Sequence, residues 1–276
     1  MNVNINQLEL PKASAYAAEA LGIITGPEPD SKKLERAIMC DPILASTLLR
    51  YANSPLNRRY HEITNVPAAL RLLGLKSVHS AIVTATMHSL LPDDSALGKQ
   101  ILEHMVDTSM MCKLIARHCC RTAADDLEFL GLIHDVGMLV LASNFAAPYR
   151  RIVKTAMEEA IEVDRLEYAE FGLSHDSVSA HVAHDFRLPA LHVELLRSFH
   201  QREPITEVND DRARDICVLA LAHRLLNESV EAGPCLPETI LETGDQLKHA
   251  LSMSDQTIDG IVDEYSALTA GKTDAG

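Results

Sequence analysis

The most apolar run of the chain, Leu130 to Leu141, reads LGLIHDVGMLVL and holds a histidine and an aspartate side by side. Apolar residues surround this pair, which is typical of a helix buried nearly all round. The pattern predicts that the run belongs to one helix over residues 123–142. A buried carboxylate next to an imidazole is costly unless a partner stabilises it. The sequence therefore predicts a hydrogen-bond network or a bound cation at His134 and Asp135.

Helical periodicity dominates the rest of the chain as well. Over residues 97–121, positions 101, 105, 108, 112, 115 and 119 share one apolar face. Capping patterns mark several helix starts, with Asp41 before Pro42 as the clearest and Ser31 as another predicted cap. No segment alternates as a strand does, so the predicted fold class is all-α. The other predicted helices cover residues 12–23, 31–39, 42–52, 66–73 (ended by Gly74), 76–91, 148–162, 165–170, 175–186, 190–199, 210–228, 245–251 and 254–268.

Composition narrows the class of protein. The net charge of −14 argues against nucleic acid and against an anionic membrane as partners, because both need a basic face. The six cysteines show no zinc-type spacing, although Cys119 and Cys120 are adjacent, and four of the six read as small buried hydrophobes. Residues 1–10 do not resemble a signal peptide, and no apolar run reaches the length of a membrane span. These features predict a cytoplasmic protein.

An ordered set of short segments resembles the HDOD domain, a relative of the HD phosphohydrolase superfamily. The resemblance covers roughly residues 8–228 and implies a multi-helix HD-like bundle with an N-terminal helical HDOD subdomain. We expect that subdomain at residues 1–92, the HD-like bundle at 93–230 and a helical extension at 231–276, with the seam near residues 90–96. The matching segments are Leu10-Pro11, Asp41-Pro42, Leu48 to Ser54, Ile63-Thr64, Leu73 to Leu75, Gly131 to Gly137, His175, Leu188-Pro189 and His200.

The resemblance also implies a candidate metal site. Enzymes of the superfamily hold one or two divalent metals with histidines and aspartates from several helices, and imidazole with carboxylate suits Fe, Mn, Zn or Ni, with Mg a further candidate. This chain departs from the pattern at Phe199, where relatives often have a second His, and at His223, where the last ligand is usually Asp. The candidate metal ligands are His104, His134, Asp135, His175, His200 and His223.

Each candidate also has a simpler interpretation. The chain has three His-Asp dipeptides, at His134, His175 and His184, so the dipeptide alone is weak evidence, and a vestigial buried hydrogen-bond pair is favoured over a metal site at His134 and Asp135. We expect His181, His184 and His192 to lie on solvated polar faces. His61, with Arg58 and Arg59, forms the one basic cluster, which could contact a phosphate or simply be a solvated loop.

These observations support two hypotheses. The first is a bacterial signalling or regulatory module that acts through contacts with a partner protein and is non-catalytic or weakly catalytic. The second is a metal-dependent phosphohydrolase that acts on a nucleotide or cyclic dinucleotide. The incomplete ligand set favours the first, whereas the order of the candidate ligands along the chain keeps the second open. A third possibility is a site that binds metal or ligand and senses it without turnover.

Overall fold

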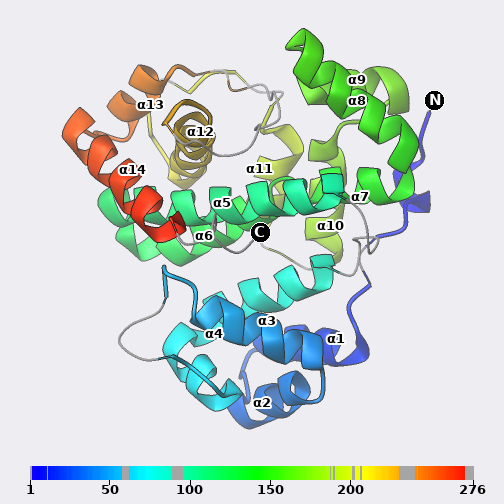
Figure 1. Cartoon of the computed structure of the whole chain (residues 1–276), viewed down its shortest axis with the longest axis vertical. Coiled ribbons are helices and arrows are strands. Elements are labelled where there is room, and N and C mark those ends of the chain that lie inside the picture. The colour runs from blue at the N-terminus through cyan, green and yellow to red at the C-terminus, as the bar shows by residue number, and fades with distance from the viewer. Residues whose placement is uncertain are drawn as a thin grey trace. The chain divides into compact units, whose positions relative to one another are not determined.

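The structure is a computed structural model that describes residues 2–10, 12–57, 62–88, 96–186, 188, 190–200, 203–205, 207–229, 240 and 242–270. Every regular element in these residues is a helix (Figure 1), which confirms the predicted all-α fold class. The described residues fall into two compact units, a smaller one formed by residues 12–88 and a larger one formed by residues 2–10 and 96–270. This grouping differs from the predicted division at residues 92 and 230, because residues 2–10 and 242–270 pack with the larger unit.

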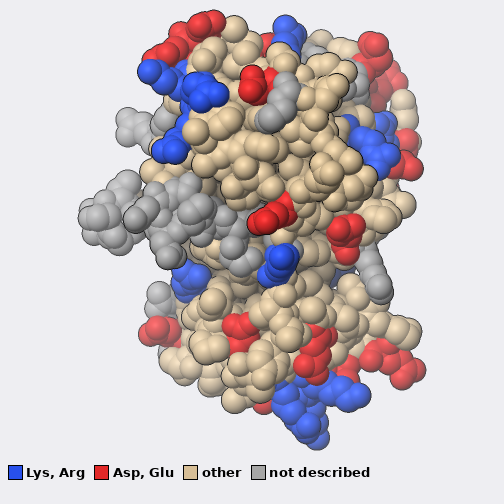
Figure 2. All heavy atoms as spheres, turned by 90° about the vertical axis from the view of Figure 1, so that its right-hand side faces the viewer, with Lys and Arg blue, Asp and Glu red and all other residues tan. Residues whose placement is uncertain are grey.

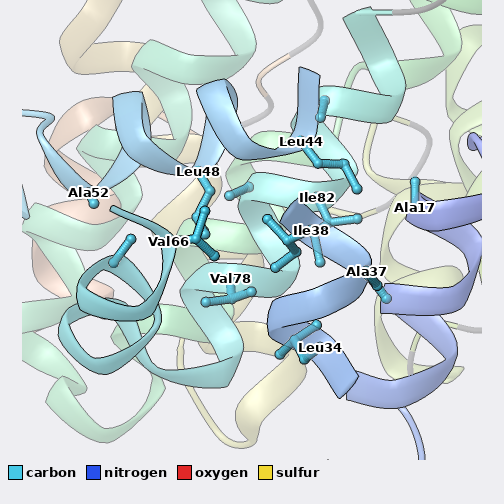
Figure 3. Packing of buried hydrophobic residues seen from close by; sticks show 14 residues of the cluster. Ala17, Leu34, Ala37, Ile38, Leu44, Leu48, Ala52, Val66, Val78 and Ile82 are labelled. Carbon is cyan, nitrogen blue, oxygen red and sulfur yellow. The ribbon is translucent and has the colours of Figure 1, made fainter. Parts of the chain in front are cut away.

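The smaller unit contains α1 (Ala15–Ile24), α2 (Ser31–Met39), α3 (Pro42–Ala52) and α4 (Val66–His88). Its core is aliphatic. Figure 3 shows side chains from all four helices pointing toward one another around Ile38. These positions recur at helical spacing, such as Leu44 and Leu48 on α3, so each helix buries one apolar face.

Aspartates fix two of the helix starts in the smaller unit. The Asp41 carboxylate accepts hydrogen bonds from two backbone N–H groups in the first turn of α3, at 2.9 and 3.2 Å, as predicted. The predicted cap at Ser31 is wrong by one residue. The Asp30 side chain accepts the bonds at the start of α2, and Ser31 is the first helical residue. An acidic cap also complements the helix dipole, which an uncharged serine cannot do.

A break at Gly74 divides α4. Gly74 has φ +72° and ψ 171°, a conformation that favours glycine, so the first helical piece ends there as the sequence predicts. By length and a mean hydropathy of 1.2, α4 is the one helix in the described part of the chain that could cross a membrane. The break interrupts it, and 44% of its most apolar window is buried inside the protein.

The larger unit is built around its longest helix, α5 (Ala96–Cys119), which packs against α6, α7, α12 and α14 (Figure 1). A buried ion pair strengthens the contact with α6, since the Lys113 ammonium lies 2.6 Å from Glu128. The remaining elements are η1 (Ile5–Gln7), η2 (Arg121–Ala123), α6 (Ala124–Ile133), α7 (Val136–Asn144), α8 (Ala146–Glu159), α9 (Val163–Phe171), α10 (His175–Asp185), α11 (Ala190–Ser198), α12 (Asp211–Ser229), α13 (Gly244–Ala250) and α14 (Asp255–Thr269).

Candidate metal centre

The predicted helix over residues 123–142 is in fact two helices that meet at the His-Asp pair. α6 ends at Ile133, and Asp135, with φ −105° and ψ 17°, is the residue before α7. The single-helix prediction is wrong. Because both helices are buried, apolar residues continue across the turn, and the hydrophobic pattern does not mark it. The turn brings His134 and Asp135 to a junction between helices.

Two glycines allow the close packing on each side of this turn. A Cβ at Gly131 would lie 2.9 Å from the Ser109 backbone on α5, and a Cβ at Gly137 would clash with the His175 carbonyl oxygen on α10. The Gly137 N–H also donates to the Ser179 hydroxyl at 2.9 Å. Gly131 therefore allows α6 to pack closely against α5, and Gly137 allows α7 to pack closely against α10.

Three histidines, one each from α5, α12 and the turn after α6, form the first ligand group. His104 lies on α5 and His223 on α12, and His134 follows α6. The ring centroids of the three histidines are 4.7–5.4 Å apart, and their ligand atoms lie within 4.8 Å of one another. The Asp135 Oδ2 atom lies 2.9 Å from Nε2 of His134 and 3.4 Å from Nε2 of His104.

The hydrogen bond at the other nitrogen of His134 defines its role. Nδ1 lies 2.7 Å from the Gly131 carbonyl oxygen, which can only accept, so Nδ1 carries the proton. In the neutral ring, Nε2 then presents a lone pair to the Asp135 carboxylate. Two such acceptors 2.9 Å apart need a proton or a metal ion between or beside them.

The second ligand group lies on the other side of Asp135. It consists of His175 and Asp176, the first two residues of α10, and His200, just after α11, with ligand atoms within 4.8 Å of one another. Nε2 of His175 is 3.8 Å from Oδ1 of Asp135 and 3.7 Å from Oδ1 of Asp176. Since Asp135 faces both groups, the two form one continuous cluster.

Buried carboxylates orient the second group. Oε2 of Glu167 on α9 accepts hydrogen bonds from both Nδ1 and the backbone N–H of His175, at 2.6 and 2.7 Å, and Oε1 accepts one from the Tyr149 hydroxyl at 2.6 Å. Asp176 lies 2.8 Å from Nδ1 of His200. A carboxylate on the far nitrogen fixes the ring and raises its basicity, as in the outer shell of many metal sites.

The charges of the cluster follow from these contacts. Burial opposes ionisation of Asp135, but His134, His104 and His175 together hold its pKa well below the usual range. Burial lowers the pKa of His175, yet the carboxylates of Glu167, Asp176 and Asp135 outweigh it and raise the pKa to about 10. Without a metal, the Asp135 carboxylate is therefore ionised and His175 holds a proton.

The residues fit a metal ion. Both Asp135 oxygens, Nε2 of His134 and Nε2 of His175 are buried and make no hydrogen bond within the described part of the chain. A buried carboxylate without such bonds is expensive, and coordination of a cation would satisfy it. The imidazole-rich donor set favours Fe, Mn, Zn or Ni over Mg, which prefers oxygen ligands.

The structure brings all six predicted ligands together. Sequence reasoning missed Asp176 as a member of the cluster and Glu167 as its support. Two signals could have found them: Asp176 completes a second His-Asp dipeptide, and Glu167 lies between Val163 and Phe171 on the buried face of α9. A carboxylate on an otherwise apolar helix face is a candidate for a buried role.

The remaining histidines differ in outcome. His184 is exposed and His181 half-buried, but the prediction that His192 is solvated is wrong, because the residue is buried and only 8% exposed. Arg58, Arg59 and His61 lie outside the described residues, as does the predicted seam at residues 90–95.

One comparison with known proteins shows a family. The family model of the HDOD domain matches residues 10–202, more than half of the chain. Among curated proteins, no sequence matches this chain.

Several solved structures share the fold over 96% of this chain. An HDOD domain protein of unknown function from Geobacter sulfurreducens superposes with a TM-score of 0.69 at 21% identity, over 94% of its length. A protein from Shewanella amazonensis SB2B, assigned by inference as a metal-dependent phosphohydrolase, gives 0.66 at 16% over 93%. One from Marinobacter aquaeolei VT8, assigned by inference to signal transduction, gives 0.70 at 18% over 59%. At these identities the similarity shows the fold alone.

Proposed function

Because this chain belongs to the HDOD domain family, we propose that it is a signalling or regulatory protein whose HD-like site binds divalent transition metal without efficient turnover. One observation carries the proposal. Asp135 is completely buried, and its two oxygens make no hydrogen bond in the described residues. They face His104 on α5, His134 in the same turn and His175 on α10. We infer one ion in each ligand group, with Asp135 between them.

Burial favours binding over catalysis. His134, Asp135, His175, His200 and His223 are each at most 4% exposed, and His104, with 13% of its side chain exposed, is the most accessible ligand. A nucleotide needs a cleft of several hundred cubic ångströms that reaches the metal. Ligands packed this tightly suit an ion that holds helices together or is sensed, better than one that must meet a phosphate ester.

The departures from the family pattern point the same way. The Phe199 ring lies 4.8 Å from His200 and 6.0 Å from His223, so an apolar wall stands where relatives often place a second histidine. His223 replaces the usual terminal aspartate with a neutral donor. The first change removes a metal donor, and the second removes a negative charge that would stabilise bound metal during phosphate chemistry.

The smaller unit supplies a candidate surface for a partner protein. Met39 at the end of α2 and Ile43 at the start of α3 are 60% and 62% exposed, which places two exposed large apolar side chains four residues apart. Figure 2 shows broad areas without charged side chains on one face of the molecule. We expect Ile43→Lys to weaken capture of a signalling partner, with Tyr168→Lys, at a 63% exposed position of the larger unit, as the matched control.

Metal-dependent hydrolysis of a nucleotide or cyclic dinucleotide is the second candidate function. It is favoured by the two ligand groups that share one carboxylate, because paired metals can stabilise both oxygens of a phosphoryl displacement. A bound metal would supply Lewis acidity and an activated water. Glu167 and Asp176 would hold His175 and His200 in position for it.

Metal content and turnover, measured on one preparation, separate the two candidate functions. We expect elemental analysis to find transition metal at up to two ions per chain, and hydrolysis of bis(p-nitrophenyl) phosphate no faster than in Asp135→Asn. Protein that contains no metal and cannot be loaded by Mn²⁺ or Zn²⁺ would overturn metal binding. Robust turnover that disappears in Asp135→Asn would overturn the non-catalytic assignment and establish the hydrolase.

A further inference from the structure

The adjacent cysteines form a second reactive feature, distinct from the metal centre. Cys119 is the last residue of α5, and Cys120 is the residue before η2. Their Sγ atoms lie only 3.3 Å apart, and both side chains are half-buried rather than enclosed. Two sulfurs in contact and within reach of solvent form a dithiol that a small oxidant can approach.

The surroundings distinguish the two thiols. A hydrogen bond from Cys119 lowers the pKa of Cys120, and Arg214 lowers it further, although burial and the carboxylates of Asp215 and Asp211 oppose both effects. The same hydrogen bond, together with burial, raises the pKa of Cys119. Cys120 is therefore the more acidic of the two thiols, and Cys119 is the less acidic one beside it.

The other described cysteines are poorly placed to compete. Cys112 lies seven residues before Cys119 on the same helix and is completely buried. That separation corresponds to about 10 Å along the axis, beyond the roughly 7 Å limit for a disulfide between Cα atoms. Cys217 is buried, and Cys40 is exposed in the smaller unit.

We propose that Cys119 and Cys120 are a redox modification site, at which a peroxide converts the adjacent thiols to a disulfide. In the first step, the Cys120 thiolate attacks hydrogen peroxide, an S–O bond forms, the O–O bond breaks, and the released hydroxide takes up a proton as water. The sulfur is then a sulfenic acid, oxidised by two electrons, and the peroxide is reduced.

The second step closes the ring. The Cys119 sulfur attacks the sulfenic sulfur, the S–S bond forms, the S–O bond breaks, and the hydroxide leaves with the thiol proton as a second water. Adjacent Cα atoms are about 3.8 Å apart, closer than the range of about 4.4–6.8 Å for ordinary disulfides. The link is therefore strained and is readily reduced again by thiols, which suits a reversible mark.

Mass spectrometry tests the proposal on the full-length protein. Reduced protein is treated with equimolar hydrogen peroxide, remaining thiols are blocked with N-ethylmaleimide, and peptides are mapped. We expect the peptide with Cys119 and Cys120 to lose two hydrogen atoms and carry no maleimide, and dithiothreitol to reverse this. Cys40 serves as the internal control, since it has no partner cysteine within its unit's described residues and stays maleimide-labelled.

One variant, Cys119→Ser, separates the roles of the two sulfurs. With the resolving thiol removed in Cys119→Ser, peroxide leaves a sulfenic acid on Cys120 that dimedone traps, whereas wild type gives little adduct. Phenylarsine oxide provides a readout without peroxide, because it binds dithiols. We expect one equivalent to stay bound to wild type in excess monothiol and to be lost in Cys119→Ser, with circular dichroism confirming that the variant is folded.

Several results would overturn the proposal. These are maleimide on both adjacent cysteines after peroxide, a disulfide from either of them to Cys112, Cys217 or Cys235, or sulfonic acid as the main product. Failure of wild type to retain the arsenical would show that the two sulfurs do not act as a pair. None of these outcomes depends on whether the His-Asp cluster holds a metal.

Discussion

The two ligand groups of the candidate metal centre use the same residue types but are supported in different ways. In the first group, the far nitrogen of His134 donates to a neutral backbone carbonyl. In the second, the far nitrogens of His175 and His200 face the buried carboxylates of Glu167 and Asp176. An anionic partner makes a ring more basic, so the second group binds metal more strongly but must first release a proton. The two ligand groups should therefore respond differently to mutation and to pH.

Asp135→Asn should have the largest effect, since Asp135 faces both groups. Loss of an outer-shell partner alone costs roughly 10–100-fold in metal affinity, so loss of the shared ligand should cost at least about 100-fold. Elemental analysis and calorimetric titration with Zn²⁺ measure it. Asp185→Asn is the matched control, because it alters an exposed His-Asp dipeptide. Equal metal content in the two variants would remove Asp135 from the site.

Gly137→Ala should disrupt the second ligand group through a packing clash alone. The added Cβ would clash with the His175 carbonyl oxygen, and overpacking of a close contact costs about 1–3 kcal/mol, here at the upper end or beyond. Urea unfolding followed by circular dichroism measures the change. Gly22→Ala is the control, since nothing lies within 4 Å of its Cβ. We expect that change to stabilise α1 by roughly 0.5–1 kcal/mol. If Gly137→Ala left the free energy of unfolding unchanged, the close contact would be refuted.

Glu167→Gln should separate the two groups most directly. The amide keeps the shape of the side chain but removes the charge beside His175, so affinity in the second group should fall by roughly 10–100-fold. The first group should keep its ion, and titration should show one strong site instead of two. Glu170→Gln, on an exposed position of the same helix, is the control. Equal weakening of both sites would mean that Glu167 supports the whole fold and not one half.

These residues show what the sequence could and could not predict. Helix ends such as Asp41-Pro42 and Gly74 were predictable because caps and breakers act within one turn. The turn at His134 was not, since α6 and α7 are both apolar and no glycine or proline stands at the junction. The candidate ligands followed from their order in a known family. Glu167 was missed because its partner, His175, lies on another helix, and spacing along the chain carries no information about such pairs.

Metal affinity in the second group should depend on pH. The pKa of His175 is raised to about 10, so below that pH a metal must displace a proton from Nε2, and affinity should fall by about tenfold for each unit of acidification. The sign for the metal-free fold is opposite. Because the folded pKa exceeds the ordinary 6.5, protonated His175 stabilises the fold fully below pH 6.5, and this contribution is lost as the pH rises towards 10. Mn²⁺ titrations at pH 6, 7 and 8 test this, and a constant affinity would contradict it.

Tyr149→Phe should have the smallest effect on metal affinity, and the effect should be confined to the second ligand group. It removes one hydrogen bond, from the hydroxyl to Oε1 of Glu167, while the two bonds from His175 to Oε2 remain. The carboxylate stays charged and in place, so the loss of metal affinity should be roughly threefold to tenfold, below the range for Glu167→Gln. Tyr168→Phe, at an exposed neighbouring position, is the matched control. If Tyr149→Phe were as damaging as Glu167→Gln, the hydroxyl, and not the charge of the carboxylate, would be the main support of His175.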